Sequence, residues 1–174
     1  MQISAEEYLN EVYRDWEGDW EGDFDYVDGA LQRHDWGDYS HSEMHGKLMH
    51  WFVDRKKEWG VFVRPSYTIQ ITPTRFRVPD LMIFDIGTPR EEIAVTIVPR
   101  IVIKVLSPED TVMHVEALEE DYRSKGISSI WFFDPSRETG WDCQQDVWLR
   151  TKKFVVPNTP IILDLSSLVD EATS

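Results

Sequence analysis

Cysteine is nearly absent from this 174-residue chain, whose one thiol is Cys143. A single thiol excludes a disulfide within the chain and is typical of proteins kept in a reducing compartment, so we expect a cytoplasmic location. No apolar run approaches the ~20 residues that a membrane-spanning helix needs. Residues 1–10 contain no basic residue ahead of an apolar stretch and therefore do not resemble a signal peptide. No membrane partner is expected.

Positive charge is also scarce. The chain has 18 Lys and Arg against 32 Asp and Glu, which gives a formal net charge of −14. Residues 1–38 carry much of the excess, with twelve acidic residues against Arg14 and Arg33. Such a surface repels phosphates, because nucleic-acid binding depends on Lys and Arg that displace counterions. The composition disfavours DNA as a partner and leaves open an acidic interaction protein that mimics nucleic acid or docks a basic protein.

Bulky apolar residues are plentiful, with eight Trp, eight Phe and six Tyr in a chain that is 41% hydrophobic. We therefore expect one domain over residues 1–174, with a proper core. An acidic, Trp-rich insertion is predicted at about residues 15–23, where Asp15-Trp16-Glu17-Gly18 is followed by Asp19-Trp20-Glu21-Gly22. The order of its acidic residues does not match a calcium-binding EF-hand loop, so a solvated loop is the better interpretation.

Two helices are predicted in the first 60 residues. Ser4 with Glu7 forms a capping box, which predicts a short helix to about Arg14. A longer helix is expected to begin at Ser40 or Ser42 and to run to Glu58 before Gly60. Its histidines are His41, His45 and His50. Although His41 and His45 have the spacing of shared metal ligands, neither zinc-protease pattern fits, so we expect partly exposed histidines without a metal.

The remaining pattern is mainly that of strands. A hairpin with an Asp28-Gly29 turn is expected at 24–33. Further strands are predicted at 61–71, 80–86, 101–106, 127–133, 141–149, 153–156 and 161–165, the last leading into a short helix. The segment 101–106 is apolar enough to be central.

One crossover helix is expected directly after this central strand. Ser107-Pro108-Glu109-Asp110 predicts its start, with Ser107 as the N-cap, and Gly126 its end. Val112, Val115, Leu118 and Tyr122 are its predicted inward residues. The order of elements indicates an α/β (α+β) fold with a mixed central sheet flanked by helices.

Asp80 is the first candidate functional residue. It stands at the start of a predicted strand, and the neighbouring strand would bring it close to Val102–Lys104. An acidic residue at a strand start, facing polar residues on the next strand, is a frequent frame for a hydrolytic Mg²⁺ site.

Several landmarks occur together in one order along the chain. They are Phe24-Asp25-Tyr26-Val27-Asp28-Gly29, the helix with His45, Val78-Pro79-Asp80, Val105-Leu106-Ser107-Pro108, Tyr122, Gly126-Ile127 and Ile130-Trp131-Phe132-Phe133-Asp134-Pro135. Together they resemble the Uma-two family of putative restriction endonucleases, within the PD-(D/E)XK nuclease superfamily. The resemblance implies a restriction-endonuclease-like fold, metal-dependent cleavage of DNA and, by analogy, a homodimer.

The resemblance also implies which positions would carry the chemistry. Asp80 matches the first metal-binding acid, and Asp25 takes an often acidic position near the hairpin. Lys104, however, stands where the second metal-binding acid belongs. His114 stands where the family has an aspartate, and Leu118 where it has a lysine. The candidate catalytic set is Asp80, Lys104 and His114, vestigial or rearranged, and the candidate metal ligands are Asp80 and Asp25.

These departures leave two interpretations. An ammonium at ligand distance repels Mg²⁺, so Lys104 would pair with Asp80 and the protein would need no cofactor. In the other interpretation, Val102-Ile103-Lys104 retains a catalytic lysine. Mg²⁺ would then be held by Asp80 and Asp25, with Glu43 as a further ligand. We expect the first, a nuclease fold with a degenerate site and a binding or scaffolding role.

Overall fold

The computed structural model describes residues 2–14, 24–33, 37–145 and 147–168. The acidic insertion predicted at 15–23 lies outside them. The described helices are α1 (Ala5–Arg14), α2 (Tyr39–Asp54), α3 (Lys56–Trp59) and α4 (Val112–Ser124), with a short 3-10 turn at Leu165–Ser167. The strands are β1 (Phe24–Val27), β2 (Ala30–Arg33), β3 (Val61–Pro65), β4 (Ile69–Thr72), β5 (Arg75–Arg77), β6 (Leu81–Asp85), β7 (Ile101–Val105), β8 (Ser129–Asp134), β9 (Thr139–Cys143), β10 (Trp148–Thr151), β11 (Lys153–Val155) and β12 (Ile162–Asp164).

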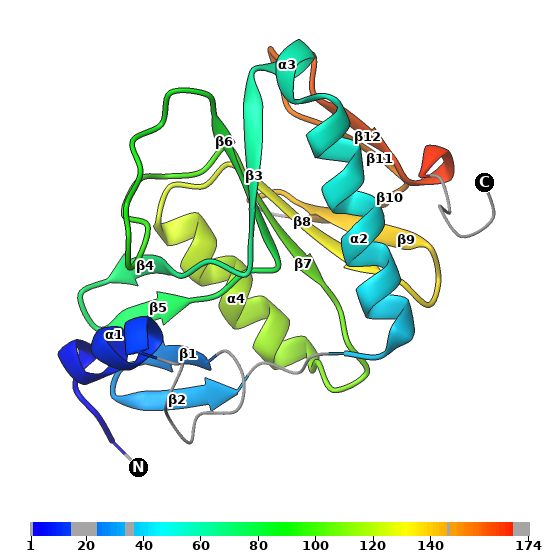
Figure 1. The fold of residues 1–174 in the computed structure, drawn as a ribbon. Coiled ribbons are helices and arrows are strands. Elements are labelled where there is room, and N and C mark those ends of the chain that lie inside the picture. The colour runs from blue at the N-terminus through cyan, green and yellow to red at the C-terminus, as the bar shows by residue number, and fades with distance from the viewer. Residues whose placement is uncertain (1, 15–23, 34–36, 146, 169–174) are drawn as a thin grey trace.

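A six-stranded sheet in the order β10-β9-β8-β7-β6-β3 forms the centre of the molecule (Figure 1). Strands β7 and β8 are parallel and are joined by α4, whereas their other neighbours pair antiparallel. The predicted central strand and its crossover helix are both confirmed. All five residues of β7 are buried, as expected for a strand covered on both faces.

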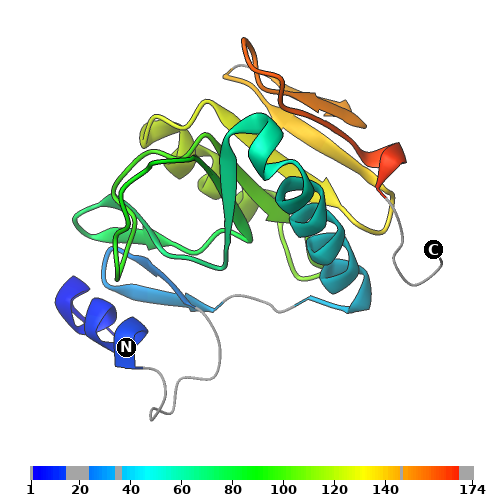
Figure 2. The ribbon, with the colours of Figure 1, turned by 45° about the horizontal axis from the view of Figure 1, so that its top comes forward.

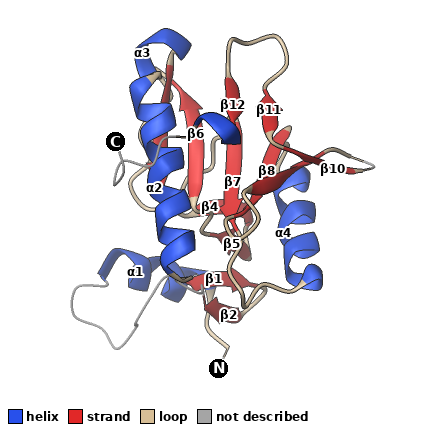
Figure 3. Ribbon diagram, turned by 90° about the vertical axis from the view of Figure 1, so that its right-hand side faces the viewer, coloured by secondary structure: helices blue, strands red, loops and turns tan. Residues whose placement is uncertain are grey.

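Helices α2 and α4 lie on opposite faces of this sheet (Figure 3). Because successive side chains of a strand point to opposite faces, Leu81 and Ile83 of β6 pack in the core under α2. Met82 and Phe84 pack in the other core, under α4. Asp80 directly precedes β6, which places it at the end of the sheet, where it meets His41 and His45 of α2.

A smaller sheet in the order β2-β1-β5-β4 lies beside the central one, and α1 packs against it (Figure 2). Tyr8, Tyr26 and Phe76 form a separate small core there, with the two tyrosine rings 5.2 Å apart. The hairpin β11-β12 adds Phe154 and Leu163 to the core on the α2 side. The result is a mixed α+β fold, which confirms the predicted fold class.

Two local predictions are confirmed atom by atom. The backbone N–H of Glu7 donates to Ser4 Oγ (3.1 Å) while that of Ser4 donates to Glu7 Oε2 (2.7 Å), the reciprocal bonds of a capping box. In the β1-β2 hairpin, Asp28 and Gly29 have φ values of 48° and 96°, as a two-residue turn of this kind requires.

The helix start predicted near Ser40 or Ser42 is confirmed, since α2 begins at Tyr39; Asp38 caps it, and its carboxylate accepts the His41 N–H (3.0 Å). The predicted start of α4 is wrong. Helix α4 begins at Val112, with Thr111 rather than Ser107 as its N-cap. Asp110 accepts hydrogen bonds from the backbone and hydroxyl of Ser107, which closes a turn of its own before the helix.

The side-chain predictions for these helices were only partly correct. Val112, predicted to face inward, is the first residue of α4 and is 74% exposed. Val115, Leu118 and Tyr122 are buried as predicted. The longer predicted helix is interrupted at Arg55, so that α3 follows as a separate turn before Gly60. No helix among the residues described has the length and apolar character to cross a bilayer.

Candidate functional site

Asp80 is fixed in place through both its backbone and its side chain. Its carbonyl oxygen accepts the Ser66 N–H (2.9 Å) and lies 3.3 Å from His45 Nε2. Its carboxylate Oδ2 accepts the Val105 N–H at 2.6 Å, across the β6-β7 pairing in which Leu81 lies opposite Ile103. The prediction that Asp80 lies beside the strand that carries Lys104 is therefore confirmed.

The second carboxylate oxygen of Asp80 faces His41. The His41 Nε2 atom lies 3.5 Å from Asp80 Oδ1, and the two side chains are 8% and 16% exposed. The interaction with Asp80 raises the pKa of His41 despite its burial. Burial by itself would raise the pKa of Asp80, but His41 and the charge of Lys104 lower it. The two groups therefore favour a protonated imidazole beside an ionised carboxylate.

This arrangement corrects the prediction for the histidines of α2. We expected partly exposed side chains, yet His41 is buried and contacts the candidate acid directly. Asp38 caps α2 just before His41, so that His41 lies in the first turn of the helix, one turn before His45, and meets Asp80 at the start of β6. His50 does follow the expectation, since it pairs with Asp54 on an exposed face at 2.9 Å.

Lys104 is buried, and its Nζ lies 3.2 Å from Asp110 Oδ2. The predicted Asp80–Lys104 ion pair is wrong about the partner: among the described residues Asp80 pairs with His41, and Lys104 with Asp110. The reason is the turn after β7. It carries Asp110 back over the end of the strand, where the buried ammonium needs a carboxylate close by.

His114 lies at the edge of the same group. Its Nε2 is 3.9 Å from Asp110 Oδ1, and its side chain is 35% exposed. Burial lowers the pKa of His114, although the charge of Asp110 opposes this. The neutral imidazole is therefore the favoured form. Leu118 is buried in the core between α4 and the sheet.

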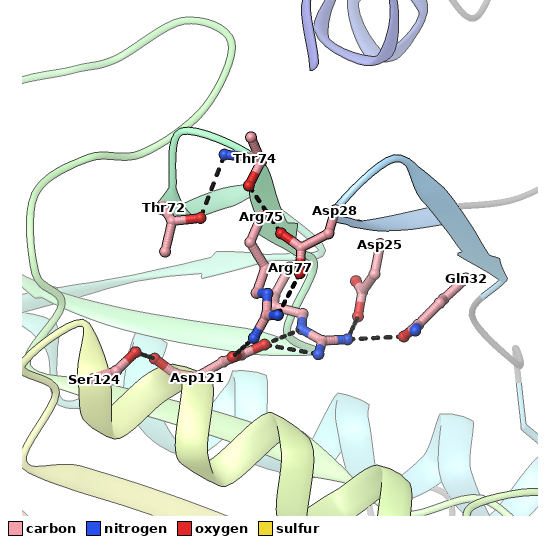
Figure 4. Close-up of polar contacts among 9 residues, drawn as sticks. All are labelled: Asp25, Asp28, Gln32, Thr72, Thr74, Arg75, Arg77, Asp121 and Ser124. Atoms are coloured by element: carbon pink, nitrogen blue, oxygen red, sulfur yellow. Dashed lines mark hydrogen bonds and ion pairs between the residues drawn. The ribbon is translucent and has the colours of Figure 1, made fainter. Parts of the chain in front are cut away.

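Asp25 belongs to a second group of charges, between the small sheet and α4 (Figure 4). Its Oδ1 accepts the Val78 N–H (2.7 Å), and its Oδ2 pairs with Arg77 (3.0 Å). Arg77 also binds Asp121 of α4 through Nε and Nη2 (2.7 Å each) and Gln32 through Nη1 (2.9 Å). Arg75 extends the group from Asp121 to Asp28. We call these residues, Asp25, Asp28, Gln32, Arg75, Arg77 and Asp121, the arginine network.

The structure thus brings Asp80, Lys104 and His114 to one end of the sheet, together with His41 and Asp110. Asp25 lies next to Val78, two residues before Asp80, but its oxygens bind Arg77 and the Val78 amide. Glu43 pairs with Lys47 at 3.5 Å. Within the described part of the chain, no group of three or more His, Cys, Asp or Glu side chains is arranged to hold a metal ion.

His41 and Asp110 are the residues that sequence reasoning missed. A signal for Asp110 was present, because a lysine in an otherwise apolar central strand must find a carboxylate, and Asp110 follows within six residues. For His41 the one signal was its spacing to His45, which did not indicate a contact with Asp80, because its burial depends on how α2 meets the sheet.

Comparison with known proteins identifies the family. A family model described as "Uma2: Putative restriction endonuclease" matches residues 10–164. The crystal structure of a putative nuclease belonging to DUF820 from Anabaena variabilis superposes with a TM-score of 0.73 at 19% identity, over 92% of this chain and 96% of that one. A cryo-EM structure of a DrdV–DNA complex gives a TM-score of 0.44 at 12% identity, over 94% of this chain and 12% of that one. No curated protein matches the chain.

The superposition with the putative nuclease reflects a shared fold, since the identity is low. The family model, in contrast, spans nearly the whole chain and covers every residue of the polar group at the end of the sheet. This chain belongs to the Uma2 family of putative restriction endonucleases.

Proposed function

We propose that this chain is a nuclease-fold protein that does not cleave DNA and acts instead by binding or scaffolding. The observation that carries the proposal is the buried ammonium of Lys104, 3.2 Å from Asp110, at the position of the family's second metal-binding acid. Mg²⁺ is bound by oxygen ligands and usually by one or two carboxylates. At ~4 Å and an effective dielectric constant of ~20, the repulsion between Mg²⁺ and an ammonium is several kcal/mol.

The contacts of Asp80 support the same conclusion. Its Oδ2 accepts the Val105 N–H and its Oδ1 faces His41, so a metal ion would have to displace a partner or share one. Asp25, the other candidate ligand, is engaged by Arg77 and by the Val78 amide. Both carboxylates are thus already used within the protein.

The charge of the chain also favours a role other than DNA cleavage. At −14 overall, the protein needs a concentrated basic face to hold a DNA duplex. In the described part of the site the positive groups, Lys104 and a protonated His41, are each paired with a carboxylate. The charge favours a basic protein as the partner.

A plasmid-nicking assay with Mg²⁺ or Mn²⁺ tests the proposal. We expect supercoiled DNA to remain intact with the wild-type protein and with the Asp80→Ala variant alike. The Lys104→Glu variant restores the acid of the family pattern. It tests whether that one carboxylate is enough to give cleavage. Nicking by the wild type that Asp80→Ala abolishes would establish an active endonuclease with a rearranged site and end the proposal.

Metal binding gives an independent readout. Under the proposal, millimolar Mg²⁺ leaves the Tm of the wild type within error of its metal-free value. An active enzyme that holds Mg²⁺ through Asp80 would be stabilised by linkage, and Asp80→Ala would remove that stabilisation. Calorimetry of both proteins with and without Mg²⁺ separates the two cases.

A further inference from the structure

A cavity of about 580 Å³ opens beside the polar group, between the first turns of α2 and α4. Leu106 and Asp110 line it from the segment after β7, and Trp141 and Trp148 line it from β9 and β10. We call it the Trp141–Trp148 cavity. The volume is that of a site for a small ligand or for one long side chain.

The two tryptophans are held firmly. Both are partly buried and pack against the core on the α4 side of the sheet. The Trp148 ring meets Phe132 edge-on, with the ring centres 5.4 Å apart, and Phe132 also lines the cavity. Aromatic rings fixed in this way form a wall that favours a cation, because the face of an indole ring carries negative potential.

The charges around the cavity also favour a cation. Asp38, Asp110 and Asp134 line it, and Arg137 is the one Lys or Arg among the described lining residues. Arg137 is 68% exposed and lies 3.7 Å from Asp134 Oδ2, so it neutralises that carboxylate only weakly. Lys104, which does not line the cavity, neutralises part of the charge of Asp110. Asp38, Asp110 and Asp134 each also accept backbone N–H groups. Three carboxylates against Arg137 and Lys104 leave an excess of one negative charge, which favours a cation over a phosphate or carboxylate.

The rim indicates the size of the occupant. Val112, which lines the cavity, is 74% exposed, and its neighbour Met113 is 79% exposed. Tyr39, the chain neighbour of the lining residue Asp38, is 77% exposed. A small free cation would need only the cavity, whereas exposed apolar side chains beside its mouth provide contact area for a polypeptide.

We propose that the Trp141–Trp148 cavity docks an arginine or lysine side chain of a basic polypeptide partner. The guanidinium or ammonium lies between the tryptophans and the carboxylates, and the chain on either side of it packs on Val112 and Met113. This inference rests on the binding role proposed above and adds to it a site and a class of partner. It does not depend on the role of Asp80 or on the result of the plasmid-nicking assay.

A fluorescent peptide of alternating Arg and Gly is the probe, titrated by fluorescence anisotropy. Controls are the same peptide with neutral citrulline in place of Arg, free arginine amide and a short DNA duplex. The variants are Asp134→Asn and Trp148→Leu, which remove a lining charge and an aromatic ring. Trp148→Phe retains a ring, and Glu92→Gln removes one charge from a different surface. Each variant is first shown by its Tm to be folded.

The expected result is that the Arg peptide binds the wild type and that citrulline removes binding. Asp134→Asn and Trp148→Leu should each weaken binding about tenfold, the loss that one cation–π or charge contact carries. Trp148→Phe and Glu92→Gln should change it less than threefold. If Trp148→Leu does not fold, Asp134→Asn against Glu92→Gln still tests the site through a missing lining charge.

Three outcomes would overturn the proposal. The first is equal weakening by Glu92→Gln and Asp134→Asn, which means attraction to net charge alone. The second is equal affinity for free arginine amide and the peptide, which means a small-molecule site. The third is no peptide binding at millimolar concentration, or preferential binding of the duplex. Plasmid nicking with normal peptide binding would refute the absence of cleavage and leave this cavity's assignment standing.

Discussion

Two groups of buried charges lie within one small molecule, and they are built differently. In the arginine network, the planar guanidinium of Arg77 contacts Asp25, Asp121 and Gln32 at once, at 2.7–3.0 Å. At the end of the sheet, each charge has one main partner: His41 with Asp80 at 3.5 Å, and Lys104 with Asp110 at 3.2 Å.

The difference follows from side-chain chemistry. A guanidinium presents five N–H donors in a fixed plane and can saturate several carboxylates, whereas an ammonium is a single point charge. Arg77 therefore joins β1, β2, β5 and α4 into one unit, and it is 2% exposed. The group around Asp80 keeps His114 35% exposed and adjoins an open cavity. The denser cluster of buried charges thus joins strands and a helix, while the looser one surrounds Asp80, the candidate metal-binding acid.

The largest effect is expected from Arg77→Met. The variant leaves Asp25 and Asp121 buried without their common cation, which should lower the free energy of unfolding by about 3–5 kcal/mol. Urea denaturation measures the loss. Arg100→Met is the matched control, because the Arg100–Asp85 pair is exposed and should contribute less than about 1 kcal/mol. Equal losses for the two variants would show that the arginine network is not the stronger one.

A smaller loss is expected from Lys104→Met. Asp110 then loses its ammonium but retains hydrogen bonds from the Ser107 backbone and hydroxyl, so we expect about 1–3 kcal/mol. The double variant Lys104→Met/Asp110→Asn should recover part of that loss, because no uncompensated charge remains. A double-mutant cycle from urea denaturation measures the coupling, and additive losses would mean that the two side chains do not interact.

His41→Gln should give a loss that depends on pH. The folded-state pKa of His41 is raised above its ordinary value of 6.5, so its contribution is complete below pH 6.5 and is lost as the pH rises through the folded-state pKa. The lowered pKa of Asp80 means that its own contribution is present above about pH 4 and is lost on further acidification. The free energy of unfolding of the wild type should therefore exceed that of the variant by more at pH 5.5 than at pH 8.5. Calorimetry at the two values checks this, and a difference independent of pH would refute the protonated pair.

The smallest effect is expected from Arg75→Lys. Arg75 is 33% exposed at its side chain and bridges Asp28 to Asp121, which a lysine cannot do with the same geometry. Since solvent screens this part of the network, the Tm should fall by no more than about 2 °C. If the Tm fell as far as it does in Arg77→Met, the strongly stabilising part of the arginine network would include its exposed edge at Arg75.

Much of the fold could be predicted from local chemistry. The Ser4–Glu7 box, the Asp28-Gly29 turn and the apolar segment 101–105 each depend on neighbouring residues or on a simple alternation, and each is confirmed. The start of α4 was wrong for the same local reason. Ser107-Pro108-Glu109-Asp110 has the composition of a helix start, but Asp110 serves Lys104 and Ser107 instead, and Thr111 caps the helix.

The candidate site was predictable in position but not in pairing. The predicted strand order places Asp80 beside the strand that carries Lys104, and the structure confirms this position. Which carboxylate neutralises which cation depends on distances of a few ångströms between elements far apart in sequence. His41 meets Asp80 across 39 residues, and Arg77 meets Asp121 across 44. No periodicity or motif encodes those distances.

By itself the sequence determined the family, the mixed sheet with its crossover helix, and the presence of a lysine in the apolar central strand. These follow from side-chain periodicity, capping chemistry and ordered landmarks, all of which are local along the chain. Only the tertiary structure decided that Asp80 pairs with His41, that Lys104 pairs with Asp110, and that Asp25 is bound by Arg77. Burial removes the water that would otherwise solvate each charge, so every ion takes the partner that the packing of α2, α4 and the sheet brings within reach.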